Sequence, residues 1–216
     1  MNLWNDNVLV FLVRHGDTIL NDQNKFRGPK NVPLNAAGYR DANKLAALFE
    51  PIDLAAIFTS PKMRAFDTAK IIAERKGMEP MPNVGLMPWD IGDFGGKEKT
   101  AENVEAIQRY ICDPSLPMPH GESLDHFRGR IHPLVMNGIR LAEKVGKPII
   151  IVGHSSVIHE ASALIAGDHM ACKVKPGGVV AIYAENGVLH ACPIFKQDEG
   201  ATTQNTLGMK HGTTIS

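Results

Sequence analysis

Two short stretches of this chain are apolar at every position, and they constrain its fold more than any other feature. Val8 to Val13 and Ile149 to Val152 hold aliphatic and aromatic residues without the alternation of a half-exposed strand. Short, wholly apolar runs are typical of central strands in a sheet that is covered on both faces. Leu54 to Phe58 is a weaker third candidate. Strands of this kind predict a parallel sheet between helical layers.

Helical patterns separate these runs. A helix is predicted after Asn35, a candidate N-cap, because apolar residues follow it at helical spacing. Ser60 and Pro61 predict the start of the next helix, as N-cap and first-turn proline. Further helices are predicted around Val104, Ile107 and Ile111, around Leu124, Phe127, Ile131 and Leu134, and from just after His154 to about Ile165.

The sequence near residues 178–192 predicts a β-hairpin. Residues 178–184 and 188–192 read as strands, and Asn186-Gly187 between them suits a tight hairpin turn. The fold class expected from all these elements is α/β, a three-layer α/β/α arrangement with a mostly parallel central sheet.

The length of 216 residues, with 44% hydrophobic and 21% charged residues, suits one large α/β domain better than two small ones. We place this domain at residues 1–195. Residues 196–216 are polar and show little periodicity, so they are predicted to be a C-terminal extension rather than a second domain.

Charge and cysteine content exclude several classes of function. Lys+Arg and Asp+Glu number 23 each, so the formal net charge is zero, which argues against general affinity for nucleic acid or a membrane surface. Cys112, Cys172 and Cys192 lack CxxC spacing, so neither a disulfide framework nor a zinc site is indicated. The N-terminus does not resemble a signal peptide, and no apolar run is long enough to span a bilayer. A soluble, cytoplasmic protein is therefore expected.

Basic residues and histidines follow three of the predicted strands. Arg14 and His15 come directly after the first run, Arg64 lies one turn into the helix after the Leu54 to Phe58 run, and His154 follows the Ile149 run. Ligands of parallel α/β sheets bind at the carboxyl ends of the strands, where loops lead into helices. We therefore expect these four side chains to converge at one edge of the sheet.

Such a set fits phosphoryl transfer. A phosphoryl group in transfer spreads negative charge over its oxygens, which Arg14 and Arg64 can bind with forked, permanently charged donors. A neutral imidazole is a competent nucleophile when an acceptor holds its second nitrogen, and Gly16 would let the backbone fold close to the ring of His15. His154 would be a further donor to phosphate, and the backbone N–H groups of the helix that opens at Ser155 would add partial positive charge.

The segment from Leu12 to Thr18, with Asn21 three residues on, resembles the signature of the histidine phosphatase superfamily, also called phosphoglycerate mutase-like. Other segments resemble that family in its own order: Phe26-Arg27-Gly28 followed by Val32 to Gly38, Ser60 to Ala69, Gly92 to Gly96, Gly121-Glu122-Ser123, and Val152 to Ser155. One such motif is weak evidence, but six in order with fitting spacing cover residues 8 to about 193.

The resemblance implies a fold, an intermediate and a set of site residues. It implies a three-layer α/β/α fold and a phosphohistidine formed on His15. It also implies that Arg14, Arg64 and His154 bind the phosphate with help from Asn21. No metal and no other cofactor is implied.

The chain departs from the family at the proton donor. In many members a glutamate stands four residues before the glycine that corresponds to Gly92, and here that position is Pro88. Asp90 could replace it if its loop turns the carboxyl inward. Glu122 is a second candidate, with the alternative that it orients His154 or caps a helix. If neither serves, the enzyme would favour leaving groups that need no proton, such as aryl phosphates, acyl phosphates or phosphohistidine.

The leading hypothesis is a metal-independent phosphatase acting on phosphomonoesters, with a small phosphorylated compound or a phosphoprotein as substrate. Phosphoglycerate mutase activity is disfavoured, because residues 97–119 lack the adjacent arginines with which the mutases recognise a substrate carboxylate. A non-catalytic protein that binds a phospho-ligand is a third hypothesis, although a pure binder has no need for the nucleophile. The sequence leaves open whether the chain forms a homodimer.

Overall fold

A computed structural model describes residues 7–168 and 172–195, and in these residues six strands form one sheet in the order β3-β2-β4-β1-β5-β6. The strands are β1 (Val8–Arg14), β2 (Ala56–Thr59), β3 (Met81–Pro82), β4 (Ile149–Gly153), β5 (Val179–Glu185) and β6 (Val188–Phe195). The pairs β1–β4, β2–β4 and β2–β3 are parallel, whereas β5 and β6 add an antiparallel edge. The predicted α/β class with a mostly parallel sheet is confirmed. The predicted extension at 196–216 lies outside the described residues.

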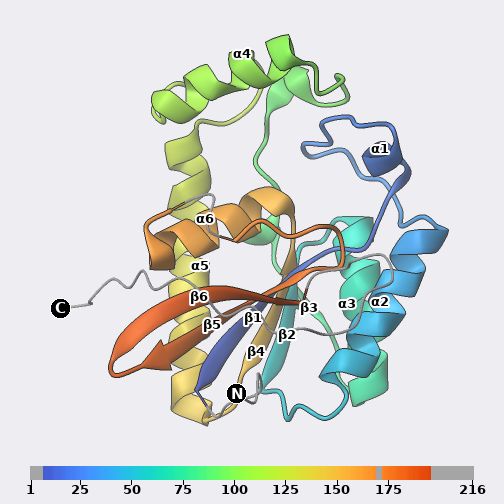
Figure 1. Ribbon diagram of the computed structural model, residues 1–216, viewed down its shortest axis with the longest axis vertical. Coiled ribbons are helices and arrows are strands. Elements are labelled where there is room, and N and C mark those ends of the chain that lie inside the picture. The colour runs from blue at the N-terminus through green and yellow to red at the C-terminus, as the bar shows by residue number, and fades with distance from the viewer. Residues whose placement is uncertain (1–6, 169–171, 196–216) are drawn as a thin grey trace.

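Helices cover both faces of this sheet (Figure 1). α2 (Ala36–Phe49) and α3 (Met63–Lys76) pack on one face, and α5 (Leu124–Val145) and α6 (Ser155–Ala166) pack on the other. Along β1, Phe11 and Val13 pack in the hydrophobic core under α2 and α3, while Val10 and Leu12 pack in the core under α5 and α6. Because successive side chains of a strand point to opposite faces, a strand between two cores is apolar at every position.

The hairpin at the antiparallel edge has the predicted turn. Asn186 and Gly187 have φ values of 53° and 75°, the pair of positive angles that a type I′ turn requires. β5 lies against β1, so this hairpin closes one side of the sheet next to the strand that leads into His15.

The helix starts agree with the sequence at one position and differ at another. Asn35 caps α2, and its side chain accepts a hydrogen bond from the N–H of Gly38. The prediction of Ser60 as the N-cap of α3 is wrong, because the helix begins at Met63 after Lys62. The side chain of Asn31, from another loop, accepts the N–H of Met63 at 2.9 Å. The hydroxyl of Ser60 instead lies 2.9 Å from Nε2 of His154.

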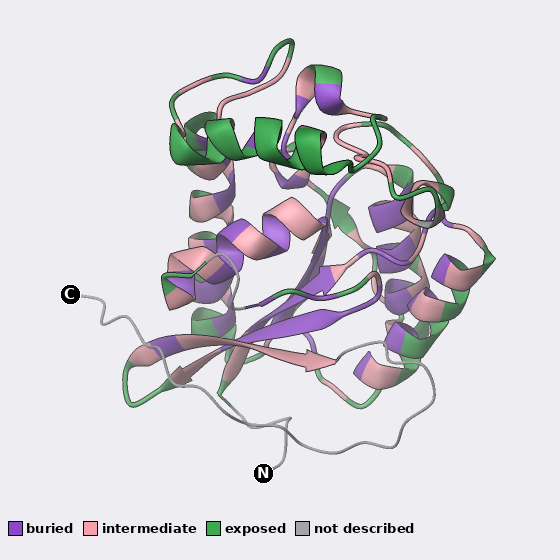
Figure 2. Cartoon of the chain, turned by 45° about the horizontal axis from the view of Figure 1, so that its top comes forward, coloured by how far each residue is buried: buried purple, intermediate pink, exposed green. Residues whose placement is uncertain are grey.

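Two further helices lie beyond the carboxyl ends of the parallel strands (Figure 1). They are α1 (Ile19–Asp22) and α4 (Ala101–Cys112), and short 3₁₀ turns at Val84–Leu86 and Gly92–Phe94 accompany them. α4 occurs where predicted, but Val104 and Ile111 are 50% and 40% exposed, while Ile107 is buried. Figure 2 shows the exposed colour dominating this helix. None of the helices in the described part of the chain has the length and apolar character needed to cross a bilayer.

Two glycines allow the loop after β1 to lie directly on the start of α2. A Cβ atom on Gly16 would lie 2.4 Å from the carbonyl oxygen of Gly38, and one on Gly38 would lie 2.2 Å from that of Asp17. Both obstacles are backbone atoms, which cannot move aside as a flexible side chain can. The close approach fixes the loop that carries His15.

We therefore expect Gly38→Ala to lower the free energy of unfolding by about 1–3 kcal/mol, the usual cost of overpacking. Gly129→Ala is a matched control, because Gly129 lies inside α5 with no atom within 4 Å of an added Cβ. That substitution should raise stability by up to about 1 kcal/mol through helix propensity. Urea unfolding measures both changes. Equal effects of the two substitutions would contradict the close approach at Gly38.

Candidate active site

The structure brings the four predicted residues together at the carboxyl end of the sheet. Arg14 ends β1 and His15 follows it, Arg64 lies in the first turn of α3, and His154 stands between β4 and α6. The ring centroids of His15 and His154 are 5.3 Å apart. Nε of Arg64 lies 3.2 Å from Nε2 of His15. Strand ends distant in the sequence thus build one cluster, as the parallel sheet predicts.

The imidazole of His15 is held in one tautomer. Its Nδ1 lies 2.6 Å from the carbonyl oxygen of Gly16, and since a carbonyl only accepts, Nδ1 carries the proton. Nε2 therefore carries the lone pair, which accepts the N–H of Nε of Arg64. The loop is fixed by Thr68, whose hydroxyl accepts the N–H of Gly16 at 3.1 Å and donates to the carbonyl of Arg64 at 2.7 Å. The ring is fully buried.

The guanidinium groups of Arg14 and Arg64 are held by backbone carbonyls. Nη1 of Arg14 donates to the carbonyl of Val174 at 2.7 Å. Nη1 of Arg64 donates to that of Lys30 at 2.6 Å, and Nη2 to that of Gly28 at 3.3 Å. Carbonyls orient the two forks without cancelling their charge, so both remain able to bind an anion.

Two buried polar atoms of this cluster lack a hydrogen-bond partner among the described residues. They are Nε of Arg14 and Nδ1 of His154, whose Nε2 faces Ser60. Unpartnered buried polar groups are rare and cost roughly 1–3 kcal/mol each. An oxyanion placed between these residues would satisfy them, which is the strongest geometric sign of a phosphate site.

Positive charge accumulates around the imidazoles. Burial, followed by the charge of Arg27, lowers the pKa of His15 well below its ordinary value. Burial, followed by the charge of Arg64, does the same for His154. Burial together with Arg27 lowers the pKa of Arg14 and of Arg64 to about 9 each. Near neutral pH both imidazoles are uncharged and both guanidinium groups are charged, a combination that suits a nucleophile facing a phosphate.

Asn21 and Ser155 occupy different surroundings. Oδ1 of Asn21 accepts hydrogen bonds from the hydroxyl of Thr18, at 2.7 Å, and from Nη1 of Arg27. Its carbonyl oxygen is thus engaged, and any contact of Asn21 with phosphate would use the amide nitrogen. Ser155 is the first residue of α6 and lines the cavity described below, with its hydroxyl 3.5 Å from Nε2 of His159.

Neither proposed proton donor turns its carboxyl toward the imidazole cluster. Oδ1 of Asp90 accepts the N–H of Gly92 at 3.0 Å, in the turn that starts at the positive φ of Gly92. Glu122 binds Nη2 of Arg130 at 2.6 Å and the N–H of Asp90 at 2.9 Å. Burial alone would raise the pKa of Glu122, but the hydrogen bond from Arg130 leads the effects that outweigh it and lower this pKa. A donor role for either residue stays a prediction, and their contacts do not favour it.

A cavity of about 340 Å³ opens over the cluster. It is lined by Arg14, Lys25, Phe26, Arg27, Gly28, Arg64, Pro88, Trp89, Ile91, Lys99, Ile107, His154, Ser155, Ser156 and His159. These lining residues include five cationic side chains and no carboxylate. Because the net charge of the chain is zero, an anion site in it needs a local cluster of positive side chains, and this cavity has one.

Sequence reasoning missed Arg27, Lys25 and Lys99 as members of this cavity. All three lie in loop-rich segments without periodicity. Arg27 stands in the family segment Phe26-Arg27-Gly28, but for Lys25 and Lys99 positive charge was the one available signal. It also missed the supporting hydroxyls of Ser60 and Thr68, which lie in a segment that the family resemblance does cover.

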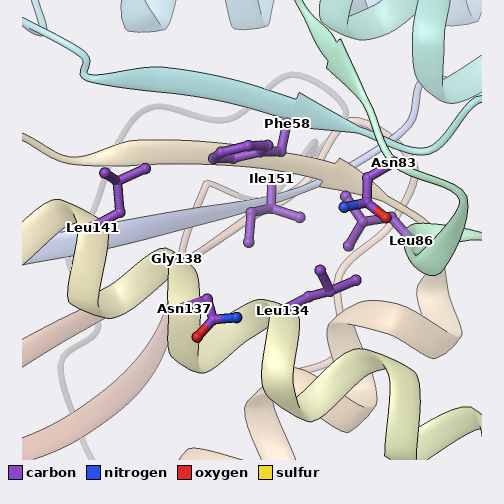
Figure 3. Close-up of a pocket in the computed structure, with 8 residues that line it drawn as sticks. All are labelled: Phe58, Asn83, Leu86, Leu134, Asn137, Gly138, Leu141 and Ile151. Atoms are coloured by element: carbon purple, nitrogen blue, oxygen red, sulfur yellow. The ribbon is translucent and has the colours of Figure 1, made fainter.

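A second cavity, of about 160 Å³, lies between α5 and the sheet (Figure 3). It is lined by Phe58, Asn83, Leu86, Leu134, Asn137, Gly138, Leu141 and Ile151. None of these side chains is charged or nucleophilic, so the first cavity is the candidate active site.

Comparison with known proteins agrees with this geometry. A family model described as "Histidine phosphatase superfamily (branch 1)" matches residues 10–173. The chain therefore belongs to the histidine phosphatase superfamily, branch 1.

Individual relatives include both phosphatases and mutases. The chain is 32% identical over 160 residues to "Uncharacterized phosphatase PhoE" of Bacillus subtilis, covering 73% of this chain and 77% of that protein. It is 29% identical over 185 residues to "Bifunctional protein Rv2228c" of Mycobacterium tuberculosis, covering 84% of this chain and 46% of that protein. The chain thus spans about half the length of the Mycobacterium relatives that it matches.

Among solved structures, a mycobacterial glucosyl-3-phosphoglycerate phosphatase superposes with a TM-score of 0.73 at 20% identity, covering 89% of this chain and 99% of that one. A phosphoglycerate mutase of Bacillus anthracis gives 0.72 at 20% identity, covering 87% and 93%. At these identities the likeness establishes the fold.

The lowered imidazole pKa values predict how stability depends on pH. As pH falls below about 6.5, the ordinary pKa of histidine, the unfolded chain binds protons that buried His15 and His154 resist in the folded state. Their contribution to stability is therefore present above this pH and lost below it. Urea unfolding in phosphate-free buffer at pH 8 and pH 5 measures the loss.

His15→Gln and His154→Gln should each flatten this pH dependence, because each removes one resisting imidazole. His190→Gln is the matched control, since His190 lies on β6 and stacks on Tyr183 with ring centroids 5.2 Å apart. A pH dependence that both site variants leave unchanged would contradict the buried, neutral state of the pair.

Proposed function

We propose that the protein is a phosphomonoester hydrolase that works through a phosphohistidine on Nε2 of His15. The observation that carries the proposal is the neutral, tautomer-fixed imidazole of His15 beside the buried, unpartnered nitrogens Nε of Arg14 and Nδ1 of His154. A proton on Nδ1 of His154 would make both of them donors to a phosphate. A phosphate that satisfies those donors would place its phosphorus near the lone pair of Nε2, which is the arrangement that in-line displacement requires.

In the first step Nε of Arg64 passes its hydrogen bond from Nε2 of His15 to a phosphate oxygen. The freed lone pair of Nε2 then forms the N–P bond, while the bond from phosphorus to the leaving oxygen breaks and its electron pair passes to that oxygen. Arg14 and Arg64 bind the equatorial oxygens and stabilise the charge that they carry in the transition state. Water then attacks phosphorus, the P–N bond breaks, and inorganic phosphate leaves. The chain's own side chains supply the positive charge for both steps, so the reaction is proposed to need no metal ion.

The same contacts favour hydrolysis over the two alternatives. A mutase must hold its dephosphorylated intermediate, and the cavity lining includes the apolar side chains of Pro88, Trp89 and Ile107 and no two arginines adjacent in the chain. A protein that only binds a phospho-ligand has no use for a histidine whose Nδ1 proton is fixed on a carbonyl. Phosphatases and mutases both occur among the relatives, so this preference rests on the cavity of this chain.

Phosphate release from p-nitrophenyl phosphate in the presence of EDTA tests the proposal. His15→Ala should lower kcat/KM by at least about 10³-fold, because it removes the nucleophile. His190→Ala, on the far edge of the sheet, is the control and should retain full activity. Turnover by His15→Ala equal to wild type would sink the mechanism. Interconversion of 2- and 3-phosphoglycerate faster than their hydrolysis would favour the mutase alternative.

The proton donor is tested separately with Asp90→Asn and Glu122→Gln. A true donor would cost roughly 10²–10⁴-fold on alkyl phosphates and little on aryl phosphates. Since Asp90 binds Gly92 and Glu122 binds Arg130, we expect the ratio of alkyl to aryl rates to change by less than about threefold in either variant. A selective loss on alkyl phosphates in one variant would identify that residue as the donor.

A further inference from the structure

The loop of residues 25–30 brings a third guanidinium group into the candidate active site. Arg27 lines the cavity with Arg14 and Arg64, and its Nη1 donates to Oδ1 of Asn21. Among the side chains that the structure describes, no carboxylate lies within 4.0 Å of it. Arg14, Arg64 and His154 are assigned to phosphate binding, but no function in the reaction has been assigned to Arg27.

Backbone contacts fix where Arg27 stands. Phe26 pairs with the next excursion: its N–H donates to the carbonyl of Lys97 at 2.9 Å, and its carbonyl accepts from Gly96 at 2.7 Å. On the other side of Arg27, a Cβ on Gly28 would lie 3.0 Å from Cγ1 of Ile91. The loop is therefore seated on residues 91–97, directly after the wall formed by Pro88 and Trp89.

The opposite side of the same loop is held by the phosphate-binding arginine. Arg64 donates to the carbonyls of Gly28 and Lys30, one and three residues after Arg27. The loop of Arg27 is thus held by Arg64, and the side chain of Arg27 lines the same cavity as Pro88, where the family places its proton donor, and Trp89. In an in-line displacement on phosphorus, the leaving oxygen departs on the side away from Nε2.

We propose that Arg27 is a catalytic residue that binds the leaving-group oxygen and stabilises its negative charge in place of a proton donor. The inference rests on the proposed hydrolase function. As Nε2 of His15 bonds to phosphorus, the electron pair of the breaking P–O bond passes to the leaving oxygen. That oxygen departs as an anion bound to Arg27 and takes its proton from water after release, while His15 keeps its Nδ1 proton.

This mechanism defines a substrate class. A guanidinium stabilises an oxyanion through its charge and its N–H donors but does not act as a general acid, because arginine keeps its proton in proteins. Arg27 therefore suits phosphate esters of acidic hydroxyls and mixed anhydrides, such as aryl, enol and acyl phosphates. Esters of simple alcohols would react slowly, since an alkoxide is too basic to leave without a proton.

The electrostatics of the cluster place Arg27 close to the reacting atoms. After burial, Arg27 is the foremost charge that lowers the pKa of His15, of Arg14 and of Arg64. Arg27 therefore lies within electrostatic range of all three side chains. Its bond to Asn21, whose oxygen also accepts from Thr18, holds the guanidinium in place before substrate arrives.

The test compares Arg27→Gln with wild type on a series of aryl phosphates whose phenols differ in acidity. Loss of a preorganised donor costs roughly 10²–10³-fold, and we expect about the lower value with p-nitrophenyl phosphate. With phenyl phosphate, which has the more basic leaving group, the loss should be at least about tenfold larger. The ratio between the two esters does not depend on the fraction of variant that folds. Arg27→Lys should recover part of the phenyl phosphate rate, because it restores the charge without the fork.

Arg140→Gln is the matched control, since Arg140 is exposed on α5 and binds Asn137 at 3.0 Å. An equal loss on every ester with weaker inhibition by inorganic phosphate would overturn the inference, because Arg27 would then bind only the phosphate. Unchanged rates would overturn it as well. A wild-type protein inactive on all aryl phosphates would instead overturn the proposed hydrolase and this inference with it.

Discussion

The burial of like charges at the end of a parallel sheet is the constraint on which the rest of this structure depends. Arg64 is 1% exposed, His15 and His154 are 0% and 2% exposed, and Arg14 and Arg27 stand beside them. Charges taken from water are costly unless they are paired. Here the carbonyls of Val174, Gly28 and Lys30 accept the arginine donors. Carbonyl dipoles orient the guanidinium groups without neutralising their charge. The buried charge lowers the stability of the folded protein and raises its affinity for an anion.

The same arrangement accounts for the state of the nucleophile. Burial, followed by the charge of Arg27 and the other surrounding cations, disfavours a protonated imidazole, while the carbonyl of Gly16 fixes the remaining proton on Nδ1. The cations that attract a phosphate therefore also help to keep His15 neutral. The glycine contact between Gly16 and Gly38 brings the start of α2 against this loop, and Thr68 ties it to Arg64. A change in position of any one of these elements would be felt at Nε2.

Much of the candidate site could be predicted from the sequence. Each strand is recognisable from its own apolar run, and the carboxyl ends of parallel strands meet at one edge of the sheet. Arg14, His15 and His154 directly follow apolar runs, so placing the runs places the residues. Arg64 was predicted from its place one turn into the helix after the Leu54 to Phe58 run, and the family segment Ser60 to Ala69 also includes it. The sequence did not reveal that the hydroxyl of Ser60 serves His154, 94 residues away, instead of capping α3. Local propensity favoured the cap, and a tertiary hydrogen bond prevailed. The position of Arg27 depends on pairing between two irregular loops, which no periodicity encodes.

The wall at Pro88 explains why the missing carboxyl is difficult to replace from nearby. Arg130 donates to the carbonyls of Gly85 and Met87 at 2.7 Å each and of Pro88 at 2.9 Å, so one guanidinium gathers the whole segment. The carboxylate of Glu122 neutralises that guanidinium and also receives the N–H of Asp90. Protonating Glu122 for catalysis would leave Arg130 without its counter-charge and loosen the wall. The segment around Pro88 is therefore held rigid by its own contacts. In our proposal the leaving group is stabilised instead from the loop of residues 25–30, where Arg27 offers a positive charge rather than an acid.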